Sequence, residues 1–385
     1  MRILLMNQAV MPHDAIGNDI AYMTGLFGEW EYCREKQGEV VVYCETRREK
    51  ECRYNYVERS EALEILKNPE NLVIYHHSIY WEDGEKLLKE AQVESSLTEK
   101  KKTVVPARLI IRYHNVTPPD FFADYSPIFF QSCTKGREQT EQLQEAFPEA
   151  WWLCDSAYNA AELTKVPESR KKKIHPFHNL TAWEDIHPDR QVLDKLQEEK
   201  AVKVLFTGRV VPNKGHLSLV AMLEDFRENY GDHMVLYIIG KFDENLKLYT
   251  EEVKFQILAA GLEERIRFVG EITDEVLLAY YQGCDYYVSF SDHEGFGVPI
   301  IEAQYLGLPV IAKNAAAVGE VLGDGGLSFE NEISHYSAAI AYLEERPQVR
   351  QELIQAGRDN CFNRYNNEKA GKELLEWLEA EVVKA

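Results

Sequence analysis

The stretch Asp292–Ala312, DHEGFGVPIIEAQYLGLPVIA, contains a short helix whose two ends can be read from the sequence. Pro299 fits the first turn of a helix, where its missing N–H leaves no hydrogen bond unmade. Gly307 fits the left-handed residue that follows a helix, and Pro309 prevents continuation. We therefore predict a helix at 299–306 between a glycine-rich turn and an apolar segment. Such a turn attracts anions, because glycines let backbone N–H groups approach a ligand and a helix N-terminus binds phosphate.

Two carboxylates flank this anion-attracting turn. Glu294 precedes it, and Glu302 lies one turn into the predicted helix. A carboxylate would compete with phosphate for the same donors unless it bound another part of the same ligand. A nucleotide sugar has such parts, since its ribose and sugar hydroxyls donate hydrogen bonds that carboxylates accept well. The simpler alternative is that both glutamates only complement the helix dipole.

Apolar runs alternate with helical patterns along the chain, and the series starts again after residue 200. Alternation of this kind indicates α/β architecture with parallel sheets covered on both faces. The segment Ile174–Arg190 is rich in His and Pro and reads as a linker. The expected strands are 2–10, 39–45, 71–78, 107–116 and 149–156 before the linker, and 201–210, 233–241, 265–270 and 286–291 after it.

The 385 residues therefore divide into two doubly wound, Rossmann-like domains. We expect a first domain at 1–185, a second domain at 186–365, and a C-terminal helix at 366–385. Ligands of such sheets bind in crevices at the carboxyl ends of the strands, so the expected site is a cleft between the two domains.

Composition limits the classes of partner. The net charge of −21 opposes binding to nucleic acid and to anionic membranes. Basic clusters at Lys100–Lys102 and Arg170–Lys173 read as solvated loops, or as a small dock for an acidic lipid or polymer. Seven scattered cysteines favour reduced thiols. The first residues are too short an apolar run for a signal peptide, and no run approaches the roughly 18 residues of a membrane span. We expect a cytoplasmic protein, at most peripheral at the inner face of the membrane.

A bound diphosphate needs cations, and the segment TGRVVPNKG supplies two. Arg209 follows a predicted strand, and Lys214 begins the next predicted helix. An arginine can hold phosphate oxygens with two hydrogen bonds, whereas a lysine acts as a point charge. The alternative is that both are ordinary surface residues of a loop.

These motifs together resemble those of the retaining, GT-B-fold glycosyltransferases of family 4. Glu294 and Glu302 match the E-x7-E signature of that family, and Gly208-Arg209 with Lys214-Gly215 matches its GR…KG signature. RFVGEI at 267–272 is similar to its base-binding loop. HNVTPPDFF at 114–122 and DSAYNAAEL at 155–163 resemble a branch associated with polysaccharides.

The resemblance implies that the domain at 1–185 binds the acceptor, that the domain at 186–365 binds the nucleotide sugar, and that the helix at 366–385 packs back on the first domain. It also implies a role for each matched residue. Glu302 would bind the ribose hydroxyls, Glu294 would contact the transferred sugar, and Arg209 and Lys214 would neutralise the leaving diphosphate. His114 would also contact the transferred sugar, the alternative being a structural histidine. The remaining nucleotide contacts would come from Gly208, Gly295, Phe296, Gly297 and Val298, from Val269 and Ile272 around the base, and from Gly17 in the first loop.

Two histidines, His76 and His77, also end a predicted strand, and one of them would line the acceptor site if they are not structural. The implied reaction transfers a hexose from a nucleotide sugar, with UDP-glucose the first choice ahead of other UDP-hexoses and GDP-mannose, to a glycan or lipid-linked glycan. No Asp-x-Asp motif is present, so we expect no metal and no other cofactor. The alternatives are an epimerase or phosphorylase on the same fold, or a non-catalytic nucleotide-sugar-binding protein. The oligomeric state is left open.

Overall fold

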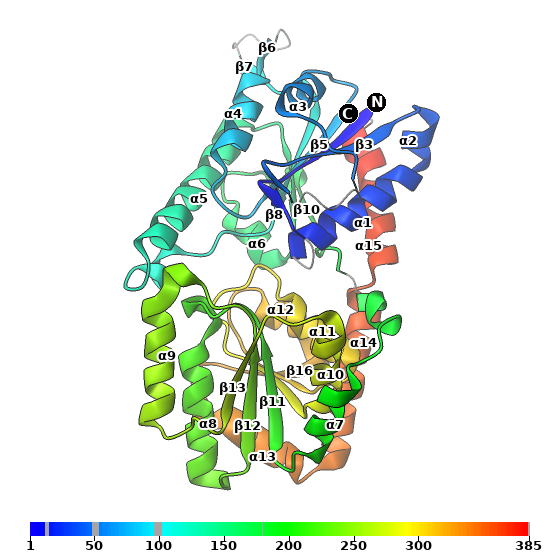
Figure 1. Cartoon of the computed structure of the whole chain (residues 1–385). Helices are drawn as coiled ribbons and strands as arrows, with labels where there is room; N and C mark the ends of the chain where they lie inside the picture. The colour runs from blue at the N-terminus through cyan, green and yellow to red at the C-terminus, as the bar shows by residue number, and fades with distance from the viewer. Residues whose placement is uncertain (12–14, 48–53, 96–101, 179, 384–385) are drawn as a thin grey trace. The chain divides into compact units, whose positions relative to one another are not determined.

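The structure is a computed structural model that describes residues 1–11, 15–47, 54–95, 102–178 and 180–383. The chain forms two compact units (Figure 1). Unit 1 comprises Met1–Val116, Ser132–His178 and Asn367–Ala385, and unit 2 comprises Thr117–Gln131 and Asn179–Asn366. Each unit contains one six-stranded parallel sheet, which is the architecture that the alternating pattern predicts.

The sheet of unit 1 has the strand order β10-β9-β8-β5-β1-β3. The order reverses beside β1, so the carboxyl ends of β1 and β5 border the crevice where ligands of such sheets bind. Two small two-stranded ladders, β2 with β4 and β6 with β7, lie outside this sheet. The strands are β1 Arg2–Met6, β2 Ala9–Val10, β3 Glu39–Tyr43, β4 Thr46–Arg47, β5 Leu72–His77, β6 Val93–Ser95, β7 Lys102–Val104, β8 Arg108–Tyr113, β9 Trp151–Cys154 and β10 Lys171–Lys173.

Apolar side chains cover both faces of this sheet. Along β1, Leu4 and Met6 join one buried cluster, whereas Ile3 and Leu5 join the other. Because successive side chains of a strand point to opposite faces, a continuous apolar run is what a sheet between two helical layers requires. The helices of unit 1 are α1 Ala15–Glu29, α2 Glu31–Glu35, α3 Arg59–Leu66, α4 Glu82–Glu90, α6 Ala157–Glu162 and α15 Asn367–Trp377, with short helical turns at Glu168–Arg170 and Leu378–Val383. Helix α5, Pro127–Ala146, begins in the segment that groups with unit 2 and continues into unit 1.

The sheet of unit 2 has the order β13-β12-β11-β14-β15-β16. This is the 3-2-1-4-5-6 order of dinucleotide-binding sheets, whose ligand crevice lies between the strands where the order reverses, here β11 and β14. The segments that follow those two strands hold the GR…KG and E-x7-E motifs. The strands are β11 Val202–Thr207, β12 Met234–Ile239, β13 Ile266–Gly270, β14 Tyr286–Ser289, β15 Val310–Lys313 and β16 Gly326–Phe329.

Unit 2 is also a three-layer unit. In β11, Val204 and Phe206 pack in one cluster and Leu205 in the other. Its helices are α7 Arg190–Glu198, α8 His216–Tyr230, α9 Lys247–Ala259, α10 Asp274–Gly283, α11 Val298–Leu306, α12 Val318–Leu322, α13 Ile333–Glu344 and α14 Pro347–Arg364. Helical turns lie at Pro119–Phe122, Leu180–Glu184, Pro212–Lys214, Glu244–Leu246 and Gly323–Gly325.

Two sequence expectations differ from the structure. The basic cluster at 170–173 is not a solvated loop, because Lys171–Lys173 forms the edge strand β10 and the Arg170 guanidinium lies 4.3 Å from the centre of the Trp151 ring. The second difference concerns REQTEQLQEA at 137–146, a segment whose pattern predicts a polar-faced helix: the helix α5 begins earlier, at Pro127, whose ring suits a first turn. Lys100 and Lys101 of the other basic cluster lie outside the described residues.

The two units do not divide at a single point in the sequence. Residues 117–131, early in the chain, group with unit 2, and residues 367–385, late in the chain, group with unit 1. The late segment contacts early residues of its own unit: the Trp30 indole N–H donates to Glu379 at 2.8 Å, and the rings of Trp151 and Trp377 meet edge to face at 5.6 Å.

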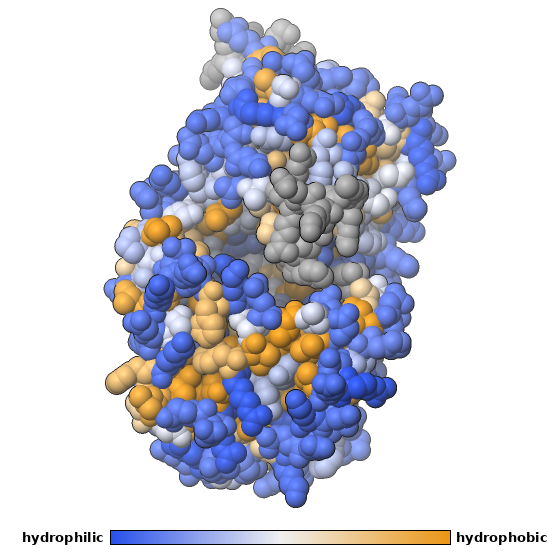
Figure 2. All heavy atoms as spheres, viewed as in Figure 1, coloured by the Kyte–Doolittle hydropathy of each residue, from blue (hydrophilic) through white to orange (hydrophobic). Residues whose placement is uncertain are grey.

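The visible surface is mainly hydrophilic (Figure 2), in keeping with the net charge of −21. Some large hydrophobic side chains are exposed as well, including Leu248, Phe255 and Leu258 of α9, each about 60% exposed. Of the described helices, none is both long enough and apolar enough to cross a bilayer.

Candidate functional site

The helix α11 begins with the turn that the sequence predicts. Gly297 precedes it with φ +101°, and Gly307 ends it with φ +86°, both left-handed conformations that favour glycine. The helix starts at Val298, one residue before the predicted start, and Pro299 lies in its first turn. Its N-terminus follows β14, at the strand-order reversal, so its backbone donors lie at the edge of the sheet where a ligand is expected.

A lysine and a glutamate from the two halves of the crevice form an ion pair. Lys214 follows β11 and Glu294 follows β14, and the Lys214 ammonium contacts the Glu294 carboxylate. The two side chains are 18% and 16% exposed, so the pair is screened from water but still reachable. The structure thus brings together Lys214, which is predicted to bind the diphosphate, and Glu294, which is predicted to bind the sugar. Arg209, in the same loop as Lys214, is exposed and forms no ion pair within the part of the chain that the structure describes.

Backbone packing fixes this loop. Gly208 has φ +151°, and Gly215 caps α8 with φ +71°. A Cβ on Gly215 would lie 2.2 Å from the carbonyl oxygen of Phe290, so the loop after β11 touches the segment after β14 through backbone alone. The close approach of these two segments is what places Lys214 beside Glu294.

Glu302 of α11 is half-buried and belongs to a partly buried chain of polar side chains. The Tyr281 hydroxyl donates to its Oε2 at 3.0 Å, and the same hydroxyl lies 3.3 Å from Thr207 Oγ1. Tyr287 joins the chain, with its hydroxyl 3.4 Å from Thr207 Oγ1. Burial raises the pKa of Glu302 to about 7, and Asp274 adds to the rise while the hydrogen bond from Tyr281 opposes it. One oxygen of Glu302 is thus oriented by protein.

The predicted base-binding residues lie near the start of α11. Val269 is in β13, Ile272 follows it, and both pack with Val298 against one apolar cluster of unit 2. The Phe296 ring is 6% exposed and meets Tyr365 edge to face at 5.3 Å, so a ligand contact of Phe296 would use its backbone. Gly295 lies with it in the turn.

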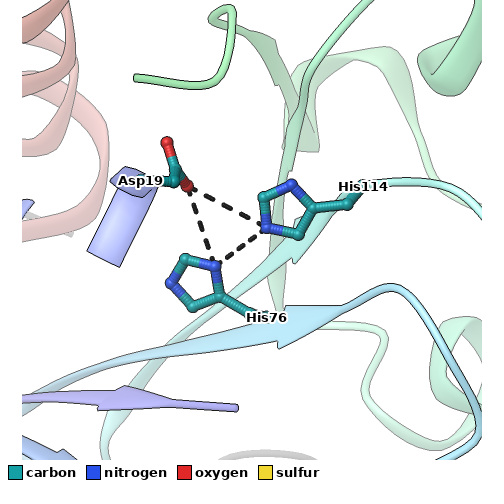
Figure 3. Close-up of side chains that lie close together, drawn as sticks. All are labelled: Asp19, His76 and His114. Atoms are coloured by element: carbon teal, nitrogen blue, oxygen red, sulfur yellow. Dashed lines mark hydrogen bonds and ion pairs between the residues drawn. The ribbon is translucent and has the colours of Figure 1, made fainter. Parts of the chain in front are cut away.

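Unit 1 holds a second cluster of polar side chains (Figure 3). Nδ1 of His76, at the end of β5, lies 2.9 Å from Nε2 of His114, which follows β8. Oδ2 of Asp19, on α1, lies 3.7 Å from the first nitrogen and 3.9 Å from the second. Of the two histidines after LVIY, His76 is therefore the one beside His114. His77 points elsewhere, with its Nε2 2.8 Å from the Thr140 hydroxyl.

A buried arginine and a second carboxylate hold this cluster in place. Arg112 is fully buried and donates to both carboxylate oxygens of Asp19, at 3.1 and 3.2 Å, and its guanidinium also lies 3.2 Å from Asp155. Asp155 accepts from Nδ1 of His114 at 2.8 Å. A carboxylate accepts only, so His114 carries a proton on Nδ1, and a neutral ring then presents the lone pair of Nε2 to the hydrogen on His76 Nδ1.

Gly17 lies in a helix and not in a loop as expected. It is a residue of the first turn of α1, and a Cβ there would lie 2.1 Å from the carbonyl oxygen of Met11. The absence of a side chain at Gly17 thus allows a close backbone contact with Met11 within unit 1.

The sequence did not point to Asp19, Arg112, Asp155, Tyr281 or Tyr287. Asp155 stands in the quoted segment DSAYNAAEL, and the two tyrosines stand in YYQGCDYYVS, so each was visible as a residue. Their importance depends on which strands are adjacent in the sheet. Residue patterns do not predict that adjacency.

Residues 189–360 match the family model described as Glycosyl transferases group 1. O-antigen chain mannosyltransferase B of Escherichia coli is 37% identical over 94 residues, which are 24% of this chain and 25% of that protein. Phosphatidyl-myo-inositol mannosyltransferase of Mycobacterium leprae (strain TN) is 29% identical over 177 residues, 45% of each chain. The aligned part thus spans less than half the length of these curated relatives.

Two solved structures are similar over nearly the whole chain. HepE of Anabaena in complex with UDP-glucose has a TM-score of 0.72 at 16% identity, covering 99% of this chain and 100% of its own. Sucrose-phosphate synthase of Thermosynechococcus elongatus has a TM-score of 0.69 at 17% identity and covers 100% of both chains. These similarities confirm the GT-B fold that the resemblance implied.

Proposed function

We propose that the chain is a retaining, metal-independent glycosyltransferase, because residues 189–360 match the family model described as Glycosyl transferases group 1. It moves a hexose from a nucleotide sugar, with UDP-glucose the first choice, to a glycan or lipid-linked glycan. The UDP-glucose complex of HepE supports a uridine donor. Because some relatives are mannosyltransferases, GDP-mannose is an alternative donor.

The observation that carries this proposal is the Lys214–Glu294 pair at the start of α11. At an ion pair beside a helix N-terminus, an incoming anion can replace the carboxylate as the partner of the ammonium. A diphosphate takes the ammonium and the helix donors, and the released carboxylate turns to the sugar hydroxyls. Glu302, one turn along α11, is then the acceptor for ribose hydroxyls.

The chemical step breaks the bond between the anomeric carbon and the phosphate oxygen and forms a bond to the acceptor oxygen on the same face. The acceptor proton passes to the departing phosphate oxygen. Negative charge grows on the diphosphate as the bond breaks, and fixed cations aimed at that charge lower the barrier most. Lys214, Arg209 and the backbone donors of α11 supply this stabilisation.

His114 contributes from unit 1. Its Nδ1–H is held by Asp155, so Nε2 is the nitrogen offered to a hydroxyl of the transferred sugar. The proposed contact replaces the hydrogen bond from His76 with one from the substrate. Asp155 is a positioning residue in this scheme, because it fixes the tautomer of His114.

An epimerase or a non-catalytic binding protein on the same fold is the competing proposal. An epimerase consumes donor without acceptor and yields a changed nucleotide sugar, and a binding protein yields no product. The products distinguish the three proposals, because among them only a transferase is expected to release nucleoside diphosphate as a final product.

The test is release of nucleoside diphosphate from a panel of UDP-, GDP- and ADP-sugars in EDTA, followed by chromatography, with and without a mixture of short glycan acceptors. Turnover of one donor that is stimulated by acceptor supports the proposal and identifies the base and sugar. A changed nucleotide sugar without released diphosphate would identify an epimerase. If the protein binds nucleotide but converts no donor with any acceptor tried, the result would identify a non-catalytic binding protein.

A further inference from the structure

Three metal-binding side chains from three separate elements meet in unit 1 (Figure 3). Asp19 comes from α1, His76 from β5, and His114 from the segment after β8. Asp19 and His76 are buried and His114 is 7% exposed in its side chain. The three donor atoms are separated by 2.9, 3.7 and 3.9 Å.

The size of this triangle fits a first-row divalent ion. The circumradius of a triangle with those sides places a point about 2.1 Å from all three atoms, and zinc bonds to histidine nitrogen and carboxylate oxygen are about 2.0–2.2 Å long. An ion at that point needs only a small opening of the contact between the two rings. Two histidines and one carboxylate are also a donor set that zinc, cobalt and iron accept.

The surroundings of the triangle are those that hold metal ligands in place. Nδ1 of His114 donates to Asp155 at 2.8 Å, the carboxylate–histidine arrangement that orients a metal-bound imidazole. Asp19 is held by Arg112 and by the backbone N–H of Phe177 at 2.7 Å. Nδ1 is the nitrogen of His76 that faces the triangle, and Nε2 of that ring is buried and has no hydrogen-bond partner within the described chain.

The charge of the cluster leaves room for a cation. Two carboxylates, Asp19 and Asp155, face a single guanidinium, that of Arg112. With neutral histidines the buried cluster carries one net negative charge, and a divalent ion would change it to one net positive charge.

We propose that Asp19, His76 and His114 form a binding site for one divalent transition-metal ion of the zinc or cobalt type. The site follows from the geometry of the triangle alone, but it shares one atom with the proposed transfer reaction. It takes Nε2 of His114, the atom offered to the sugar in that reaction, so occupancy inhibits transfer and does not support it. Without metal, the two rings are joined by their hydrogen bond.

The test is a titration of the metal-stripped full chain with Co²⁺, read by the visible absorption that a low-symmetry, histidine-bound cobalt ion gives. One equivalent is expected to saturate the signal, and Zn²⁺ is expected to displace it. His76→Gln and His114→Gln should each weaken the affinity for Co²⁺ at least tenfold. His187→Gln, a change at an exposed histidine, is the matched control and should leave the affinity unchanged.

Circular dichroism of each variant shows whether it is folded, and the wild-type titration does not depend on any variant. No saturable signal from the wild type would overturn the site. So would a signal that persists in both His76→Gln and His114→Gln, because the cobalt would then be bound elsewhere. Neither result bears on donor turnover in EDTA, so the two proposals fail separately.

Discussion

At Glu302, burial and a hydrogen bond act in opposite directions on the same carboxyl group. Burial wins, and the pKa is raised to about 7 although Tyr281 donates to the carboxylate. The ionised form is the better acceptor for ribose hydroxyls, so the group is ready for a ligand only in part at neutral pH. The residue that the sequence predicts to bind ribose is thus also one whose charge depends on pH near neutrality.

The affinity for UDP is predicted to fall below neutral pH. Ribose hydroxyls stabilise the ionised carboxyl, so binding must pay for deprotonation when the pH is below the pKa of the free protein. We expect the dissociation constant to rise about tenfold from pH 8 to pH 6. Calorimetric titration at several pH values measures it. Glu302→Gln should bind UDP more weakly, with little change between these two pH values, and a parallel pH dependence in the variant would contradict the ribose role.

The same shift predicts a stability effect. The folded protein holds the proton of Glu302 up to a higher pH than the unfolded chain does, so stability falls as the pH rises from about 4.5 to about 7. Glu302→Gln removes this loss. The free energy of unfolding of the variant should therefore exceed that of the wild type at pH 8, by ~3 kcal/mol at most, with the difference shrinking at pH 5. Urea unfolding at both pH values measures it, and a larger gain at pH 5 would show the sign to be wrong.

Residue patterns predicted several of the site residues but not their partners. The sequence predicts separate roles for Lys214 and Glu294, and the structure pairs the two side chains because β11 and β14 are adjacent. Strand adjacency is a property of the folded sheet, and neither motif contains it. For the same reason, Arg112 and Asp19, which are 93 positions apart, could not be linked from the sequence.

At the scale of single elements, α11 shows what local chemistry can determine. Pro299 and Gly307 set both limits, and the observed helix differs from the predicted one by one residue at its start. The edge strand β10 could not be predicted in this way. Its three lysines lack the apolar run of a buried strand, and it forms because β9 offers an unpaired edge in parallel register.

The glycine that caps α8 is predicted to be irreplaceable. A Cβ at Gly215 would meet the Phe290 carbonyl oxygen at 2.2 Å, and φ is +71°. We expect Gly215→Ala to lower the free energy of unfolding by more than about 2 kcal/mol, since left-handed strain and a backbone clash add. Gly270→Ala is the matched control, because its φ is +85° but no atom lies within 4 Å of the added Cβ. Its cost should be about 1 kcal/mol. Equal costs in urea unfolding would contradict the clash.

At the scale of the whole molecule, the alternating pattern predicted two parallel α/β sheets but neither strand order nor the composition of the units. Residues 117–131 group with unit 2 and residues 367–385 with unit 1. Both assignments depend on contacts between segments far apart in sequence. The sequence predicts a single boundary near 185, because the segment 174–190 is rich in His and Pro. The grouping of 117–131 with unit 2 is not part of that prediction.

The last helix is predicted to stabilise the first unit. Leu374 of α15 is fully buried in the cluster that contains Ile3 and Leu5 of β1. Leu374→Ala should cost about 2–5 kcal/mol and reduce hydrogen-exchange protection in β1 and β9 more than in β11 and β14. Leu258→Ala, at a side chain that is 62% exposed, is the control. Loss of protection confined to unit 2 would contradict the grouping.

The central claim is that the lysine beside Glu294 stabilises a departing diphosphate. The measurement that tests it most directly is the rate of nucleoside diphosphate release by the wild type and by Lys214→Ala, in EDTA, with the donor that the panel selects and at saturating acceptor. Because the ammonium acts mainly as the bond breaks, we expect kcat to fall about a hundredfold or more with a smaller change in KM. An unchanged kcat with only weaker donor binding would contradict the claim, and Lys214 would then be a binding residue alone.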